Sequence, residues 1–261
     1  MYRMNEKPIG RILISNDDGI DAIGIAVLKE VASQLSDDVW VIAPSENRSG
    51  TSRAITLRSD VVIEETAPKT YKCSGTPSDC IIFGMSQILD APPDLVLTGI
   101  NHGMNVADDI LYSGTVAGAM EASLLGVPAI ALSQRYGHDD PIDFSASRLY
   151  GTTVIRHILD MSIPLRTIMN VNFPKTEPAK IKGMKAAHLD QHKLGDVIVS
   201  GEAPNHYRLG PLDCNPETGA GSDRAVLNDG WISLTPLKLD VTSHQMLNRV
   251  PPLDLSAAKQ A

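Results

Sequence analysis

The sequence is poor in aromatic residues and in cysteine. Aromatic residues make up 4% of the 261 residues, so a hydrophobic core has to be built mainly from aliphatic side chains and alanine. The cysteines, Cys73, Cys80 and Cys214, are odd in number and scattered, which fits neither a disulfide framework nor a zinc site. We therefore expect a protein of a reducing compartment whose fold does not depend on disulfide bonds.

Positive charge and long apolar runs are also scarce. The chain has 31 acidic and 23 basic residues, a net charge of −8, which argues against binding of nucleic-acid polymers through a basic face. No apolar run is long enough to span a membrane. The first ten residues contain charges and a proline but no apolar signal-peptide segment. We expect a globular cytoplasmic protein that does not bind membranes.

Short aliphatic runs and amphipathic segments alternate from residue 11 to residue 173. This alternation predicts α/β organisation, a three-layer αβα Rossmann-like fold with a mainly parallel sheet. We expect a hairpin within 54–73, and a cap at Ser78 or Asp79 for the helix that follows. The expected strands are 11–15, 39–43, 94–98, 127–132 and 167–173, and the expected helices are 21–35, 80–89, 116–125 and 144–161.

The pattern changes after about Pro174. Short strands are expected at 181–189, 196–200, 206–209 and 231–237, followed by a short helix at 242–249. We expect a single domain over 1–261, with a Rossmann-like core at about 11–174. The extension at about 175–261 is interpreted as a β-hairpin and helical arm for oligomerisation.

Three of the expected strands end in polar loops. Because the carboxyl ends of parallel strands share one edge of a sheet, polar residues from distant loops can meet there. Carboxylate, hydroxyl and amide oxygens favour Mg²⁺ or Mn²⁺ over Zn²⁺. An ordinary acidic turn remains the alternative for Asp17-Asp18-Gly19 taken alone. The candidate ligands of one divalent cation are Asp17, Asp18, Ser49 and Asn101.

A second candidate site lies at the start of the helix expected at 116–125. Ser113, Gly114 and Thr115 precede this helix, where free backbone N–H groups and the positive end of the helix dipole can bind an anion. Asn105 is expected beside them and could donate its amide to the same phosphate. The alternative for the tripeptide alone is an ordinary helix N-cap.

The order of these motifs resembles the survival protein E (SurE) family of nucleotidases. The resemblance covers nearly the whole chain, and the joint pattern is highly specific. It depends on Asn16-Asp17-Asp18-Gly19, Asn47-Arg48-Ser49-Gly50, Gly75-Thr76-Pro77-Ser78-Asp79-Cys80, Gly99-Ile100-Asn101, Gly103-Met104-Asn105, Tyr112-Ser113-Gly114-Thr115-Val116 and Ser233-Leu234-Thr235-Pro236-Leu237.

The resemblance implies a metal-dependent phosphomonoesterase that hydrolyses nucleoside 5′- and 3′-monophosphates, and short polyphosphate, by attack of metal-activated water. It also implies homodimers or homotetramers with exchanged C-terminal segments. It assigns metal binding to Asp17, Asp18, Ser49 and Asn101, catalysis to Asp17 and Asp18, and phosphate contact to Asn105, Ser113, Gly114 and Thr115. Departures from the family pattern at Asp21, Ile23, His102 and Met104 leave substrate preference open.

The acidic pair has two other interpretations. A haloacid-dehalogenase-like phosphatase would use one aspartate as nucleophile, but in that pattern one residue separates the two aspartates, and here they are adjacent. A receiver-like signalling domain would be much shorter than 261 residues. Asp240 and His244 stand four residues apart, at helical spacing, as a catalytic pair or a structural ion pair. Their position in the C-terminal arm favours the structural role.

Overall fold

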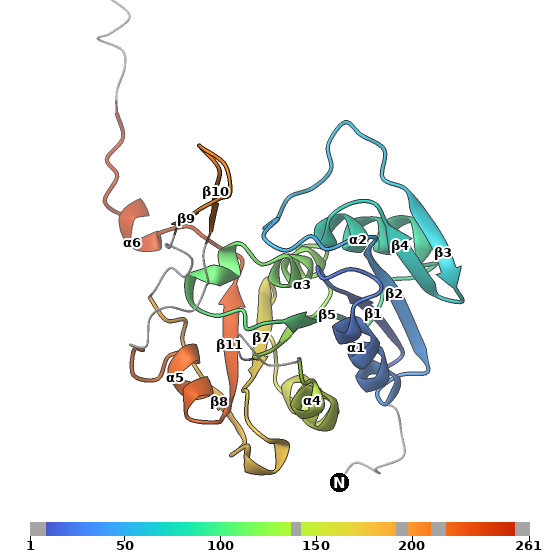
Figure 1. The fold of residues 1–261 in the computed structure, drawn as a ribbon. Helices are drawn as coiled ribbons and strands as arrows, with labels where there is room; N and C mark the ends of the chain where they lie inside the picture. The colour runs from blue at the N-terminus through green and yellow to red at the C-terminus, as the bar shows by residue number, and fades with distance from the viewer. Residues whose placement is uncertain (1–8, 137–141, 192–197, 210–217, 254–261) are drawn as a thin grey trace, which may run out of the picture.

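A central sheet of nine strands organises the protein, which we describe from a computed structural model (Figure 1). The structure describes residues 9–136, 142–191, 198–209 and 218–253. The sheet order is β3-β4-β2-β1-β5-β6-β7-β11-β8, and every pairing from β4 to β7 is parallel. The strands of this sheet are β1 (Arg11–Ser15), β2 (Asp38–Pro44), β3 (Ile63–Ala67), β4 (Thr70–Cys73), β5 (Leu95–His102), β6 (Ala129–Gln134), β7 (Thr167–Phe173), β8 (Met184–Ala186) and β11 (Ile232–Lys238).

Helices cover both faces of the sheet and confirm the predicted three-layer α/β fold (Figure 1). Successive residues of a strand point to opposite faces. Ile12 and Ile14 therefore pack in one core with α1 (Ile23–Ser33) and α4 (Ser145–Leu159), and Leu13 packs in the other. The second core is covered by α2 (Pro77–Phe83), the π-helix η1 (Gly84–Ile88) and α3 (Gly114–Leu124). Within the described ranges, no helix has the length and apolar character needed to cross a bilayer.

The start of α2 differs from the expectation. The N-cap is Thr76, not Ser78 or Asp79, and the helix begins at Pro77 rather than Cys80. The Thr76 side chain accepts from the Asp79 N–H at 3.2 Å, and the Asp79 carboxylate accepts from the Thr76 N–H at 2.9 Å. This reciprocal capping box, with proline at the first helical position, explains the earlier start.

The C-terminal part does not form a separate arm throughout. Strand β11 pairs antiparallel with β7, and β8 pairs with β11, so the main sheet continues across the boundary expected near residue 174. The pairing of β9 (Ile198–Ser200) with β10 (Tyr207–Leu209) confirms the expected antiparallel hairpin. The remaining helices are η2 (Ala107–Leu111), η3 (Pro178–Lys180), α5 (Asp223–Asn228) and α6 (His244–Leu247).

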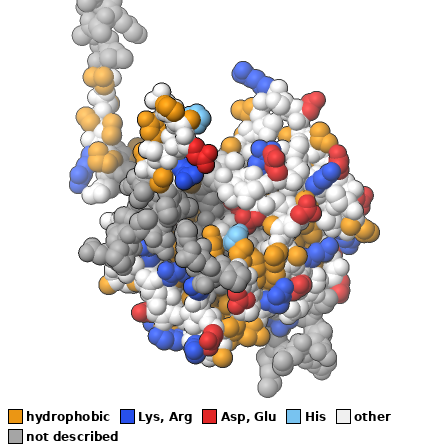
Figure 2. Space-filling view, viewed as in Figure 1, with side chains coloured by type: hydrophobic (Ala, Val, Ile, Leu, Met, Phe, Trp, Pro, Cys, Tyr) orange, Lys and Arg blue, Asp and Glu red, His pale blue; other side chains and the backbone are white. Residues whose placement is uncertain are grey.

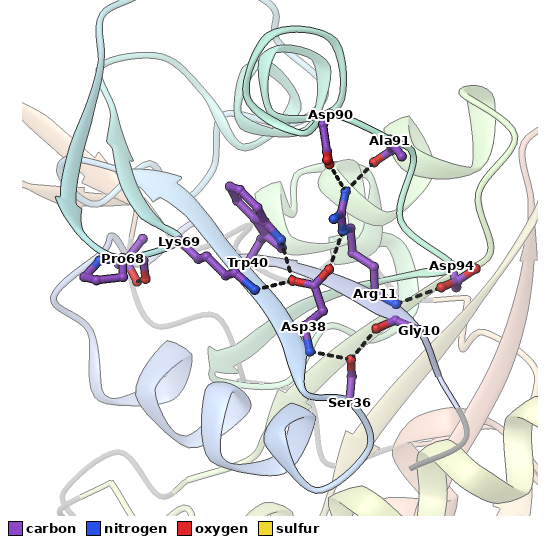
Figure 3. Close-up of polar contacts among 11 residues, drawn as sticks. Gly10, Arg11, Ser36, Asp38, Trp40, Pro68, Lys69, Asp90, Ala91 and Asp94 are labelled. Atoms are coloured by element: carbon purple, nitrogen blue, oxygen red, sulfur yellow. Dashed lines mark hydrogen bonds and ion pairs between the residues drawn. The ribbon is translucent and has the colours of Figure 1, made fainter.

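A polar cluster joins the amino ends of β1 and β2, at the edge opposite the candidate site (Figure 3). The Asp38 carboxylate accepts from Arg11 Nε at 2.6 Å, Lys69 Nζ at 2.5 Å and Trp40 Nε1 at 2.8 Å. Burial alone would raise the pKa of Asp38, but these hydrogen bonds outweigh it and lower the pKa to about 2. Arg11 also pairs with Asp90. The cluster fixes the first two strands of the sheet relative to each other.

Candidate metal and phosphate site

Asp17 lies in the turn that leaves β1 and points toward the start of α3. Its side chain is 3% exposed, and its carboxylate accepts a hydrogen bond from the Thr115 hydroxyl. A Cβ atom added to Gly114 would lie 2.7 Å from Asp17 Cβ, closer than real Cβ atoms approach other atoms. Glycine at residue 114 therefore allows the helix terminus to approach this carboxylate.

Asp18 and Asn101 converge on the same place from neighbouring strands. The Asp18 carboxylate accepts from the His102 backbone N–H at 3.1 Å, which ties the β1 loop to the end of β5. Asn101 Nδ2 donates to the Gly103 carbonyl at 2.9 Å, and Asn101 Oδ1 lies 3.4 Å from the Thr115 hydroxyl. The structure therefore brings together Asp17, Asp18 and the amide oxygen of Asn101.

Ser49 belongs to a loop that packs on the same turn. The Arg48 N–H donates to the Asp17 carbonyl at 2.7 Å, and Gly19 packs against the backbone of Glu46. Ser49 itself is exposed, and its backbone N–H donates to the Asn47 side chain at 2.8 Å. The loop lies beside the aspartates, while the role of the Ser49 hydroxyl stays a prediction.

The start of α3 has a helix N-cap, and it also has polar groups that can bind an anion. Ser113 is the N-cap, since its hydroxyl accepts from the Val116 N–H at 3.1 Å. The Thr115 hydroxyl is directed to the Asp17 carboxylate, a positioning role that the sequence did not predict. Because the helix terminus already accommodates one carboxylate oxygen, it has the polarity that an anionic phosphoryl oxygen needs.

Asn105 is held by strands β6 and β7. Its side-chain Nδ2 donates to Ser133 Oγ at 2.9 Å, and its backbone N–H donates to Asn172 Oδ1 at 2.7 Å. Its carbonyl accepts from Asn170 and Asn172 at 2.9 and 3.0 Å. Ser133 is the strand partner of Asn101, so Asn105 lies beside the proposed ligand set.

These supporting residues were missed at the sequence level, although a signal was present. Asn170 and Asn172 are polar residues two apart among the apolar residues of 168–173, and both side chains are fully buried. Residues two apart on a strand share a face. Buried amides need hydrogen-bond partners, so this spacing marks a strand face that supports a polar site.

Burial makes the two aspartates costly to charge. It is the largest cause that raises the pKa of Asp17 to about 6, with a further rise from the Asp18 charge and an opposing effect of the Thr115 hydrogen bond. Burial also raises the pKa of Asp18, opposed by the hydrogen bond from His102. A buried carboxylate next to a half-buried one favours a bound cation that neutralises both.

The donor chemistry fits a hard divalent cation. Among the described residues, no three His, Cys, Asp or Glu side chains gather as a metal site. Two carboxylates and an amide oxygen instead suit Mg²⁺ or Mn²⁺, which bind few protein ligands.

The predicted pairing of Asp240 with His244 is present. Asp240 Oδ2 lies 2.8 Å from His244 Nε2, across the N-terminus of the exposed helix α6. The Thr242 N–H also donates to Asp240, at 2.9 Å. The geometry is that of an exposed, local hydrogen bond between the two side chains.

Comparison with known proteins gives consistent results. A family model described as Survival protein SurE matches residues 12–196. A curated relative, 5′-nucleotidase SurE of Methylobacterium radiotolerans, is 43% identical over 246 residues, which cover 92% of this chain and 97% of the relative. The 5′-nucleotidase SurE of Afipia carboxidovorans is 39% identical over 255 residues, which cover 91% and 98%. The crystal structure of the SurE protein from Aquifex aeolicus has a TM-score of 0.82 and 33% identity, over 92% of this chain and 98% of that chain.

Proposed function

This chain belongs to the SurE family, and from that premise we propose that it is a 5′-nucleotidase with a divalent cation in each subunit. The proposed substrates are nucleoside 5′-monophosphates, with nucleoside 3′-monophosphates and short polyphosphate as further substrates. The observation that carries the proposal is the convergence of Asp17, Asp18 and Asn101 at the N-terminus of α3.

The proposed metal ligands are Asp17, Asp18, Ser49 and Asn101. Asp17 and Asn101 are already oriented, because the Thr115 hydroxyl lies within hydrogen-bond reach of both side chains. Mg²⁺ or Mn²⁺ at this site would supply Lewis acidity, offsetting charge on the phosphoryl group and lowering the pKa of water. Pre-oriented ligands spare the protein the cost of ordering these side chains when the ion binds.

The remaining residues bind and orient the phosphoryl group. We assign the backbone N–H groups at Gly114 and Thr115 and the hydroxyl of Ser113 to the phosphate oxygens, because they open α3. Asn105, fixed by its bonds to β6 and β7, orients the phosphate from the sheet side. Asp17 or Asp18 accepts the proton of the attacking water.

Assembly is proposed to follow the family pattern of homodimers or homotetramers with exchanged C-terminal segments. Apolar side chains near the C-terminus are exposed, among them Val241 at 92% and Val250 at 67%. A cavity of about 510 Å³ lies against β11, between Met120 of α3 and Leu239. An apolar segment of a second copy would cover such a surface.

The experiment is phosphate release from AMP with Mg²⁺, Mn²⁺ or a chelator, followed by a panel of 5′- and 3′-nucleotides and short polyphosphate. We expect Asp17→Asn to lower metal-dependent turnover about a hundredfold or more. Asp160→Asn, an exposed change at the end of α4, serves as the control. Undiminished turnover by Asp17→Asn would refute the assignment. A phosphorylated aspartate trapped during turnover would favour the covalent alternative.

A further inference from the structure

Two ring side chains meet at the edge of the candidate site, in a chain where aromatic residues make up 4% of the sequence. His102 ends β5, and Tyr136 follows β6. Their ring centroids lie 4.6 Å apart, with an angle of 42° between the planes. Both side chains are exposed, Tyr136 by 39%. The pair therefore presents aromatic surface to solvent.

The backbone fixes this pair beside the proposed metal ligands. His102 directly follows Asn101, and its N–H donates to the Asp18 carboxylate at 3.1 Å. The next residue, Gly103, donates to the Gln134 carbonyl at 3.0 Å, which joins the end of β5 to the strand that leads to Tyr136. The two rings are thus carried by the same loops that position the site.

We propose that His102 and Tyr136 form a stacking surface for the nucleobase of the substrate, an inference that rests on the nucleotidase function proposed above. A nucleoside monophosphate carries its base several ångströms from the phosphorus atom, on the far side of the ribose. His102 of the ring pair directly follows Asn101 along the chain and its N–H bonds to Asp18, so the base of a substrate held by its phosphate could reach the rings. Aromatic faces bind any base by stacking, since every base has a π-face.

A stacking surface made of two rings would select substrates by whether they carry a base and by the size of that base. Stacking distinguishes a nucleotide from a sugar phosphate without base-specific hydrogen bonds. It favours the larger face of a purine over that of a pyrimidine, because a larger face covers more of the two rings. The surface therefore selects nucleotides as a class and ranks them by ring size.

The test compares AMP with ribose 5-phosphate, which carries the same phosphate ester and no base. In Tyr136→Ala we expect kcat/KM for AMP to fall about tenfold, within the range measured for base stacking. Turnover of ribose 5-phosphate should stay within about twofold of the wild type, since nothing in that substrate reaches the ring. Tyr136→Phe keeps the ring and should keep the AMP value. His102→Ala leaves the backbone N–H to Asp18 in place and should resemble Tyr136→Ala.

Two results would overturn the stacking surface. One is an equal loss for AMP and ribose 5-phosphate in Tyr136→Ala, which would mean that the tyrosine supports the site as a whole. The other is an unchanged AMP value, which would place the base elsewhere.

Adenosine binding, measured by calorimetry, tests the stacking surface independently of phosphate release. If the wild type released phosphate from neither substrate, the proposed reaction would fail. The surface would still be judged by binding: weaker adenosine binding in Tyr136→Ala than in Tyr136→Phe supports it, and equal binding rejects it.

Discussion

Gly114 controls how closely the proposed phosphate and metal sites approach each other. Its missing side chain lets the start of α3 lie against Asp17 and Pro77. An added Cβ would lie 2.7 Å from Asp17 Cβ and 2.9 Å from Asp17 Oδ2. Because Asp17 is buried, its side chain has little free space to move into.

We expect Gly114→Ala to displace Asp17 and lower kcat/KM for AMP about ten- to hundredfold, since small misplacements of catalytic groups cost this much. Gly118→Ala, on the same helix, is the matched control. Its added Cβ would lie 3.1 Å from the Thr98 methyl group and at ordinary contact distance, 3.8 Å, from side-chain carbons of Ile81 and Pro77. Steady-state kinetics and thermal unfolding of both variants check the prediction. Equal activities of the two variants would contradict the role given to Gly114.

Asp38 contributes stability that depends on pH. Its folded pKa of about 2 lies below the ordinary value near 3.8, so the stabilisation is present above about pH 4 and is lost as the pH falls toward 2. The side chain is 27% exposed, which reduces the contribution through solvent screening. We expect Asp38→Asn to lower the free energy of unfolding at pH 7 by about 1 to 2 kcal/mol.

Urea unfolding of the wild type and Asp38→Asn between pH 7 and pH 3 measures this effect, and the difference between the two proteins should shrink as the pH falls. Asp90→Asn is the matched control. Asp90 pairs with the same Arg11 but is 81% exposed, so its change should be smaller. A difference between wild type and Asp38→Asn that does not vary with pH would show that the cost comes from packing.

At the scale of elements, α5 reaches back to the segment between β5 and η2, the loop that carries Asn105. Asp223, its first residue, is fully buried and accepts from the backbone N–H groups of Ala107 at 2.9 Å, Asp190 at 3.1 Å and Arg224 at 2.8 Å. Ala107 has a left-handed φ of 51° and follows Asn105 by two residues. The hydrogen bond to Asp223 therefore holds a strained turn next to a proposed phosphate ligand.

We expect Asp223→Asn to lower the free energy of unfolding by about 1 to 3 kcal/mol, because an amide offers one acceptor oxygen where three donors converge. The KM for AMP should also rise about three- to tenfold, as the Asn105 loop loses its anchor. Asp190→Asn is the control. Asp190 accepts from Gln191 and Gly219 and pairs with Arg224 in the same cluster, so its side-chain bonds, within the part of the chain that the structure describes, are to residues other than Ala107. If both variants change KM equally, the anchor is not specific to Asp223.

The sequence predicted the elements whose signals are local. Strands β1 and β7 and helices α1 and α4 stand out because apolar residues recur with one period between turn residues. The pairing of β11 with β7 was not predictable in this way, because sheet partners are chosen by contacts between distant residues. The hairpin expected within 54–73 is confirmed only for 63–73, since the earlier residues form no strand.

The residues of the candidate site also differ in how far the sequence predicts them. Asp17, Asp18 and Asn101 could be predicted as neighbours, because polar loop ends of a parallel sheet meet at one edge. The bond from Thr115 to Asp17 and the anchoring of Ala107 by Asp223 could not. Both depend on side-chain directions set by packing between segments that are distant in the sequence.

At the scale of the whole molecule, charged side chains and exposed apolar side chains are distributed differently. Acidic and basic side chains are interspersed over the face shown in Figure 2, so electrostatic attraction does not single out one region there. The last described segment is rich in exposed apolar residues, which are Val241, Met246, Leu247, Val250 and Leu253. In Figure 1 this segment extends away from the sheet beyond α6.

If that segment exchanges between subunits as proposed, its removal should disrupt assembly and leave the sheet intact. Deleting residues 244–261 removes α6 and the exposed apolar residues Met246, Leu247, Val250 and Leu253, while β11 ends at Lys238. We expect a smaller oligomer by light scattering, with an unchanged circular dichroism spectrum. Deleting residues 254–261 alone is the control and should keep the assembly.

His244→Ala tests whether the contact between Asp240 and His244 supports assembly. The Asp240–His244 pair is exposed and local, so its loss should cost the isolated subunit little. Because His244 belongs to the segment proposed to exchange between subunits, we expect His244→Ala to weaken assembly. Turnover of AMP per subunit should not change. Lost turnover with intact assembly would instead assign His244 to the chemistry. An unchanged assembly after deletion of 244–261 would remove the C-terminal segment from the interface.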